Sequence, residues 1–204
     1  MNFNEFEHRL IKLKNKSLPG IKSQLELAPP NRLKLIKNSK GDKKKDAAVS
    51  LCFFQDSDQN IKIPLILRNT YDGVHSNQIS FPGGKKDKCD DNLIQTAKRE
   101  TAEEIGLNQN EMKFQFKLTD IYIPPSNFLV RPYIFTINST PKIIPNPKEV
   151  VKVLSPKVAD ILNLKIRNSS NKKPINNYPY FIIEDHIVWG ATAMILNEFR
   201  ALLK

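Results

Sequence analysis

The sequence contains little of what builds disulfide-stapled, fibrous or membrane-spanning proteins. Its two cysteines, Cys52 and Cys89, are too few for a disulfide framework or a cysteine metal quartet. Seven glycines without a period exclude a collagen-like architecture. A membrane span requires a window of about 20 residues without charged side chains, and the sequence contains no such window. Because the N-terminus has no apolar core followed by a small-residue cleavage site, we predict a cytoplasmic protein.

The sequence does contain enough apolar material for one core, together with an excess of positive charge. Hydrophobic residues make up 40% of the 204 positions, which suits one ordinary domain. Lys and Arg number 32 against 21 Asp and Glu, which gives a net charge of +11. We therefore expect an anionic partner, although charge alone does not choose between a nucleotide and RNA.

Residues 1–46 predict a helical lead-in that packs on the rest of the protein. The apolar residues of its first helix recur at the spacing that places them on one face: Phe3, Phe6, Leu10 and Leu13. A second short helix is predicted at 31–36.

Residues 47–204 predict a single α/β (α+β) domain in which strands and helices alternate. The apolar runs and turn signals place strands at 47–54, 61–68, 78–81, 112–123, 128–137 and 179–189, and helices at 91–105, 156–162 and 191–203. The first two strands are expected to form a hairpin.

The helix predicted at 91–105 carries an unusual group of acidic residues. Glu100, Glu103 and Glu104 stand at i, i+3 and i+4, so they project from one side of the helix. Such carboxylates repel one another unless a hard divalent cation such as Mg²⁺ or Mn²⁺ binds them. Arg99 precedes Glu103 by one turn and can hold its carboxylate in orientation. Gly106 predicts a left-handed stop to the helix.

Taken whole, residues 84–107 resemble the signature of the Nudix hydrolases, which cleave a nucleoside diphosphate linked to another moiety. The signature runs from Gly84 to the acid Asp91 and then through residues 99–107. The first gap is one residue longer than usual, Asp91 stands where Glu is usual, and Thr101 stands where an aliphatic residue is usual.

The resemblance implies a Nudix-type α/β/α sandwich with a mixed sheet and hydrolysis of a phosphorus anhydride. It further implies that Mg²⁺ or Mn²⁺ is bound by Glu100, Glu103 and Glu104, with the Gly84 carbonyl as a further ligand. In this interpretation the ion neutralises charge on the leaving phosphate and activates a water molecule. Glu103, Glu104 and Arg99 are then expected to act in catalysis.

Three further segments resemble the coenzyme A pyrophosphatase branch of the family. They are residues 81–84 (FPGG), 122–126 (YIPPS) and 189–193 (WGATA). This branch implies cleavage of coenzyme A to 3′,5′-ADP and 4′-phosphopantetheine. Two upstream positions depart from it, because Gly73 stands where Arg is usual and Asn77 where Gly is usual.

Several residues outside the helix are candidates for substrate or catalytic roles. Arg68 and Lys85 could supply the missing positive charge, and His75 could contact phosphate. Glu149 is a candidate base or additional metal ligand. Trp189 and Phe181 stand among aliphatic residues and are expected in the core.

Two other functions stay open at this stage. One is hydrolysis of another nucleoside diphosphate derivative, such as ADP-ribose, a damaged nucleoside triphosphate or capped RNA. The other is a non-catalytic Nudix module that binds nucleotides or RNA. We expect a small nucleotide substrate, no membrane partner, and a monomer or a homodimer.

Overall fold

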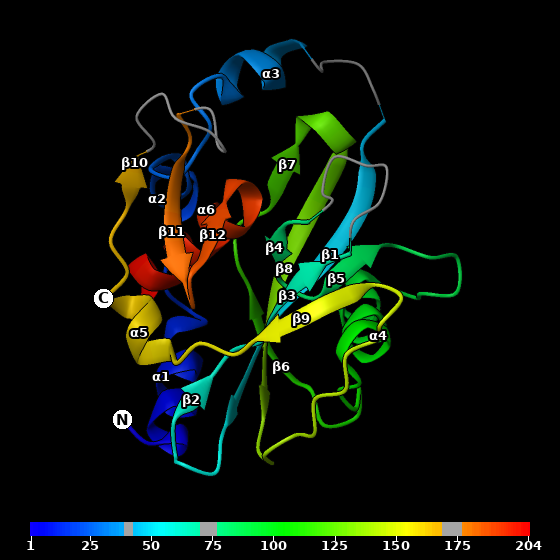
Figure 1. Ribbon diagram of the computed structural model, residues 1–204, viewed down its shortest axis with the longest axis vertical. Helices are drawn as coiled ribbons and strands as arrows, with labels where there is room; N and C mark the ends of the chain where they lie inside the picture. Colours follow the sequence, from blue (N-terminus) through cyan, green and yellow to red (C-terminus); the bar gives the residue numbers. More distant parts are fainter. Residues whose placement is uncertain (39–42, 70–76, 169–176) are drawn as a thin grey trace.

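A computed structural model describes residues 1–38, 43–69, 77–168 and 177–204. Figure 1 shows a central sheet with α4 on one side and the N-terminal and C-terminal helices on the other. Apart from the gaps between those ranges, the helices are all too short or too polar to cross a bilayer. The predicted α/β sandwich with a mixed sheet is confirmed.

The N-terminal segment forms three helices. They are α1 (Phe3–Leu13), α2 (Gly20–Leu25) and α3 (Arg32–Asn38). The predicted apolar face of α1 is confirmed, because its buried residues are the expected four: Phe3, Phe6, Leu10 and Leu13. Asn2 and Glu5 close a capping box at its start. The helix α2 was not among the predicted elements.

The central sheet is mixed and is organised by two long strands. Strand β1 (Lys45–Gln55) runs parallel to β8 (Phe128–Ile137). The remaining strands all pair antiparallel with one of these two: β2 (Ile61–Lys62) and β5 (Gly83–Lys85) with β1, and β6 (Lys113–Lys117) and β7 (Ile121–Ile123) with β8.

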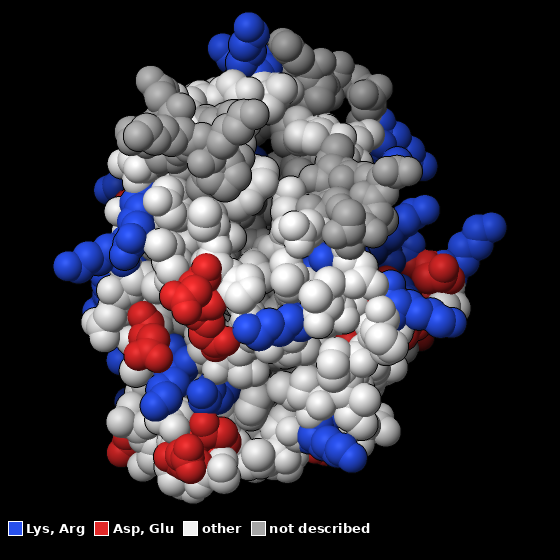
Figure 2. Space-filling view, viewed as in Figure 1, with Lys and Arg blue, Asp and Glu red and all other residues white. Residues whose placement is uncertain are grey.

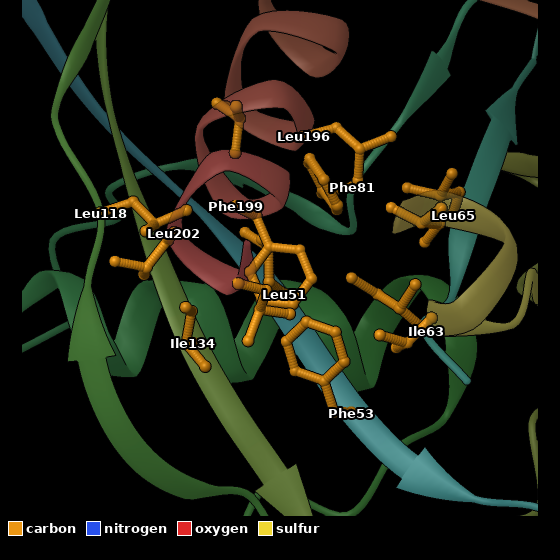
Figure 3. Close-up of a cluster of buried hydrophobic side chains, with 14 of the residues drawn as sticks. Leu51, Phe53, Ile63, Leu65, Phe81, Leu118, Ile134, Leu196, Phe199 and Leu202 are labelled. Atoms are coloured by element: carbon orange, nitrogen blue, oxygen red, sulfur yellow. The ribbon is translucent and has the colours of Figure 1, made fainter. Parts of the chain in front are cut away.

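Strand β1 is buried on both faces, which explains its continuous apolar run. Leu51 and Phe53 belong to the core shared with α1 and α6 (Gly190–Leu203), and Ala48 and Cys52 belong to the core under α4. Figure 3 shows the first of these cores, where Leu51, Phe53 and Phe199 lie together. The alternation of β1 therefore builds both halves of the sandwich.

Two small three-stranded sheets flank the central one. The first has the order β4 (Ile79–Ser80), β3 (Leu65–Arg68), β9 (Val150–Leu154), and the second has the order β10 (Arg167–Asn168), β11 (Pro179–Ile183), β12 (His186–Trp189). The short helices α5 (Val158–Leu162) and η1 (Pro124–Ser126) complete the described elements.

The single strand predicted at 61–68 is wrong. The chain forms β2, which pairs with β1 as expected of a hairpin, and then leaves the central sheet so that β3 pairs with β4 and β9. Pro64 lies between the two strands and has no N–H to continue the ladder. The strand predicted at 112–123 is likewise divided, into β6 and β7.

Helix α4 (Leu93–Ile105) packs against the face of the sheet that carries Ala48 and Cys52. Asn92 caps its start by accepting hydrogen bonds from two backbone N–H groups. Gly106 ends it in the left-handed conformation, with φ of 72°, as predicted. The acidic helix is thereby fixed at both ends beside β5.

Candidate active site

The most deeply placed acidic group of α4 is Glu104, whose residue is fully buried. Its Oε2 accepts a hydrogen bond from the backbone N–H of Gly83 at 2.8 Å, and its Oε1 accepts one from Arg68 Nη1 at 2.9 Å. The turn into β5 and strand β3 therefore both meet this carboxylate.

Burial raises the pKa of Glu104 to about 7. Arg68 and the Gly83 N–H oppose that rise, whereas the neighbouring charges of Glu100 and Glu149 add to it. Glu100 and Glu149 are thus close enough to disfavour ionisation of Glu104. Such a cluster loses its repulsion when a cation or a proton joins it.

Glu100 lies one turn before Glu104 and is half-buried. Burial raises its pKa as well, although Arg99, whose Nη2 lies 2.9 Å from Glu100 Oε1, pulls it down. A Cβ on Gly84 would stand 2.4 Å from the Glu100 carboxyl carbon. A side chain at this position would therefore have to displace the carboxylate, whereas glycine lets β5 pass beside it.

Arg99 connects the acidic helix to the loop that precedes it. Its Nη1 donates to Glu103 Oε2 at 2.8 Å, which confirms the expected contact one turn along the helix. Its Nε and Nη2 donate to the two oxygens of Asp90, and Nη2 also donates to the Lys85 carbonyl. A guanidinium with this many acceptors fixes the loop and the helix as one unit.

The acid that pairs with Arg99 is Asp90 and not Asp91, the residue assigned from the spacing. Asp90 is buried and also accepts a hydrogen bond from Thr96, whereas Asp91 is exposed. The contacts of Arg99 hold the pKa of Asp90 well below its usual range. The extra residue therefore lies after the acid, and the gap from Gly84 to Asp90 has five residues.

The unusual Thr101 has a direct structural explanation. Its hydroxyl donates to the Ala97 carbonyl at 2.7 Å and lies 2.5 Å from the Ser50 hydroxyl on β1. Each buried hydroxyl thus has a partner in the other, so the polar residue costs little where an aliphatic one is usual.

Glu103 and Glu149 stand at the outside of the site. The side chain of Glu103 is 51% exposed and pairs with Arg99. Glu149 is exposed, accepts a hydrogen bond from Asn146 at 3.2 Å, and adds charge to both Glu100 and Glu104. Glu149 lies 45 residues after Glu104 in the sequence, and the fold brings it close to the acidic cluster. A base or an additional metal ligand has to lie there.

A cavity of about 430 Å³ is lined by Arg68, Gly83 and Gly84, which lie against the carboxylates of Glu104 and Glu100. Its wall includes members of the three segments that carried the branch resemblance: Phe81, Gly83 and Gly84, then Ile123, Pro124 and Pro125, then Trp189 to Thr192. These segments are far apart in the sequence and meet only in the fold. The lining also includes residues from before the central sheet: Pro29, Asn31, Arg32 and Leu35.

Trp189, one of the aromatic residues at this cavity, was expected elsewhere. Trp189 is half-buried and lines the cavity with Tyr178, the ring centroids being 5.4 Å apart. The expectation that Trp189 belongs to the core is therefore wrong, because the end of β12 turns it toward the cavity. Phe181 is fully buried, as expected.

The cationic candidates have different placements. Arg68 lines the cavity but also pairs with Glu104, whereas Lys85 lines it and is exposed. His75 and Gly73 lie outside the described residues. Asn77 has φ of 54°, a left-handed conformation that glycine favours and asparagine tolerates, which accounts for its replacing the usual Gly.

The donor set suits a hard divalent cation in its chemistry. Glu100, Glu104 and Glu149 offer carboxylate oxygens whose mutual repulsion a cation would relieve. As the side chains stand, no three acidic, histidine or cysteine groups converge as metal ligands within the described ranges. The reason is visible in the contacts, since Arg68 and Arg99 occupy oxygens that a cation would take.

Comparison with known proteins places these features in one family. The sequence model of the NUDIX domain matches residues 44–178. The chain is 32% identical to Nudix hydrolase 15, mitochondrial, of Arabidopsis thaliana over 76% of this chain and 57% of that protein. It is 32% identical to the mitochondrial coenzyme A diphosphatase NUDT8 of Homo sapiens over 64% of this chain and 57% of that protein. The chain thus spans less than two thirds of these relatives.

Solved structures agree on the fold. A C. elegans Ap4A hydrolase in a binary complex covers 78% of this chain and 97% of its own, with a TM-score of 0.52 and 16% identity. The NUDIX domain of Shewanella oneidensis NrtR, complexed with ADP ribose, covers 84% of this chain and 98% of its own, with a TM-score of 0.52 and 15% identity. At these identities the likeness shows the fold alone.

Proposed function

The chain belongs to the Nudix family, and from that premise we propose that it hydrolyses the pyrophosphate bond of coenzyme A or of its acyl derivatives. The proposed products are 3′,5′-ADP and 4′-phosphopantetheine or its acyl form. The substrate would lie in the cavity with its pyrophosphate at the carboxylates of α4.

One observation is the main support for this proposal. The three segments that resemble the coenzyme A branch line a single cavity, and that cavity adjoins the buried carboxylates. The likeness to the human mitochondrial coenzyme A diphosphatase points the same way. Asn77 stands where the coenzyme A branch usually has Gly. This difference counts little against the proposal, because Asn77 adopts the left-handed conformation for which glycine is favoured.

We propose that Mg²⁺ or Mn²⁺ is held by Glu100, Glu103, Glu104 and the Gly84 carbonyl. When bound, such an ion stabilises charge on the leaving phosphate and lowers the pKa of an attacking water. For this the carboxylates would exchange part of their arginine contacts for the cation. Gly84 keeps the backbone of β5 close to Glu100. The Gly84 carbonyl and the Glu100 carboxylate need this closeness to bind the same ion.

The chain's own side chains have distinct parts in this proposal. Arg99 holds Glu103 and, through Asp90, fixes the loop after β5. Glu149 is the proposed base or further ligand, since its charge reaches Glu100 and Glu104 from outside the helix. Lys85 and Arg68, both on the cavity wall, are the proposed contacts to substrate phosphate.

The test is chromatographic identification of products after incubation with coenzyme A and, separately, with ADP-ribose. Each is run with Mg²⁺, with Mn²⁺ and with chelator. We expect metal-dependent release of 3′,5′-ADP from coenzyme A. Cleavage of ADP-ribose alone would keep the pyrophosphatase chemistry and refute the substrate. Binding of RNA without turnover of any nucleotide would favour the non-catalytic module instead.

A further inference from the structure

The cavity has a wall that the NUDIX domain does not supply. The domain match begins at residue 44, but Pro29, Asn31, Arg32 and Leu35 line the cavity from α3 and the turn before it. Figure 1 shows α3 at the top of the molecule, whereas α4 lies lower, along its right side. A substrate that extends along the cavity from Gly83 and Gly84 toward α3 therefore meets the N-terminal segment.

This wall is held in place by a buried polar network under α2. The carboxylate of Glu198, which is fully buried on α6, accepts hydrogen bonds from Gln24 Nε2 at 2.8 Å and from the Thr119 hydroxyl at 2.6 Å. Asn197 donates to the Ser23 carbonyl at 2.7 Å. The short connection from α2 to α3 thus starts from a fixed point, which gives the wall a defined position.

Arg32 is the charged group that this wall presents to the cavity. Its Nη2 donates to the Tyr122 carbonyl at 2.9 Å, which anchors one edge of the guanidinium. Unlike Arg68, Arg99 and Arg131, it has no carboxylate within salt-bridge distance among the residues that the structure describes. Burial lowers its pKa, in keeping with its half-buried position on the cavity wall.

A desolvated guanidinium that lacks a carboxylate gains most from an anion with several oxygens. A phosphate monoester satisfies this need, because two parallel N–H groups can donate to two of its oxygens. Figure 2 shows basic side chains at the top of the molecule, where Figure 1 places α3, so a dianion would meet a favourable field there.

We propose that Arg32 is a specificity-determining residue that binds a phosphate monoester that the substrate carries in addition to the cleaved pyrophosphate. The inference rests on the proposed function, and in coenzyme A that group is the 3′-phosphate of the nucleotide. The N-terminal segment thereby replaces a recognition charge that the sequence lacks at Gly73. Arg68 is less suited to this task because Glu104 already engages it.

The experiment compares kcat/KM for coenzyme A and for dephospho-coenzyme A, which differ only in the 3′-phosphate. The variants are Arg32→Gln and, as a matched control, Lys34→Gln, which removes the same charge from an exposed position on α3 that does not line the cavity. We expect wild type and Lys34→Gln to prefer coenzyme A by about 10- to 100-fold, the usual worth of a charge-assisted contact. Arg32→Gln should lose most of that preference, because its kcat/KM should fall for coenzyme A and stay unchanged for dephospho-coenzyme A.

A binding measurement separates this inference from the proposed function. Calorimetric titration with adenosine 3′,5′-bisphosphate and with 5′-AMP, in chelator, needs no turnover. We expect Arg32→Gln to weaken binding of the bisphosphate by about tenfold or more and to leave 5′-AMP unchanged. If neither coenzyme is cleaved but this difference appears, the proposed reaction fails and the Arg32 site stands. An unchanged preference between the two coenzymes, or equal loss for both nucleotides, refutes the site.

Discussion

Replacing Glu104 by Gln should change how the stability of the metal-free protein depends on pH. Burial raises the pKa of Glu104 from its ordinary value of 4.5 to about 7 in the folded protein. The folded state therefore binds the proton more tightly than the unfolded state does. The stability that protonation of Glu104 contributes is fully present below about pH 4.5 and is lost as pH rises toward 7. Gln cannot ionise, so the variant escapes this loss.

The magnitude follows from the size of the shift. A difference of about 2.5 pH units corresponds to about 3 kcal/mol of unfolding free energy. Gln keeps one oxygen acceptor, so losing one of the contacts to Gly83 or Arg68 offsets about 1 kcal/mol at every pH. The diagnostic quantity is therefore the change with pH in the stability difference between variant and wild type.

The assay is urea unfolding in chelator at pH 4.5, 6 and 8 for wild type, Glu104→Gln and Glu103→Gln. The last is the matched control, since Glu103 lies on the same helix with an exposed side chain. We expect the variant at position 104 to gain about 2 to 3 kcal/mol on wild type between pH 4.5 and 8, and the control to gain almost nothing. A stability difference for Glu104→Gln that stays flat across this range would refute the assigned burial.

Four other substitutions probe the site. Asp90→Asn should cost about 2 to 3 kcal/mol because it breaks a buried ion pair, whereas Asp91→Asn should stay within about 0.5 kcal/mol, both read by urea unfolding; equal effects would contradict the pairing. Gly84→Ala should lower kcat on coenzyme A by about tenfold or more with little change in Tm, because the new methyl displaces the Glu100 carboxylate. Trp189→Leu should raise KM about tenfold with kcat nearly unchanged, and an unchanged KM would remove the ring from the binding site.

The elements that obey a simple period were predictable from the sequence. The apolar positions of α1 are its buried ones, and the run in β1 reads as a strand because both of its faces are covered. The acidic helix and its glycine stop were predictable for the same reason. Where a strand leaves one sheet for another, as at Pro64, the local pattern did not reveal the change of partner.

The site was predictable in its residue types and less so in its pairings. Asp90 and Asp91 are adjacent acids, and only the path of the loop into Asn92 decides which one turns inward to Arg99. The role of Thr101 depended on Ser50, a residue from a strand distant in sequence. Such pairings are set by tertiary packing, which spacing along one helix does not describe.

The cavity was the least predictable feature. Its wall combines the turn before α3, the end of β7 and the end of β12, three places with no common motif. Trp189 follows an apolar strand, so its sequence environment resembles that of a core residue. Only the turn from β12 into α6 shows that the ring faces a cavity.

The most direct test measures release of 3′,5′-ADP from coenzyme A by wild type and by Glu104→Gln, side by side at saturating Mg²⁺. If the carboxylates of α4 carry the reaction, wild type releases 3′,5′-ADP and the folded variant loses turnover by about a thousandfold or more. Turnover by the variant near the wild-type rate would contradict the account.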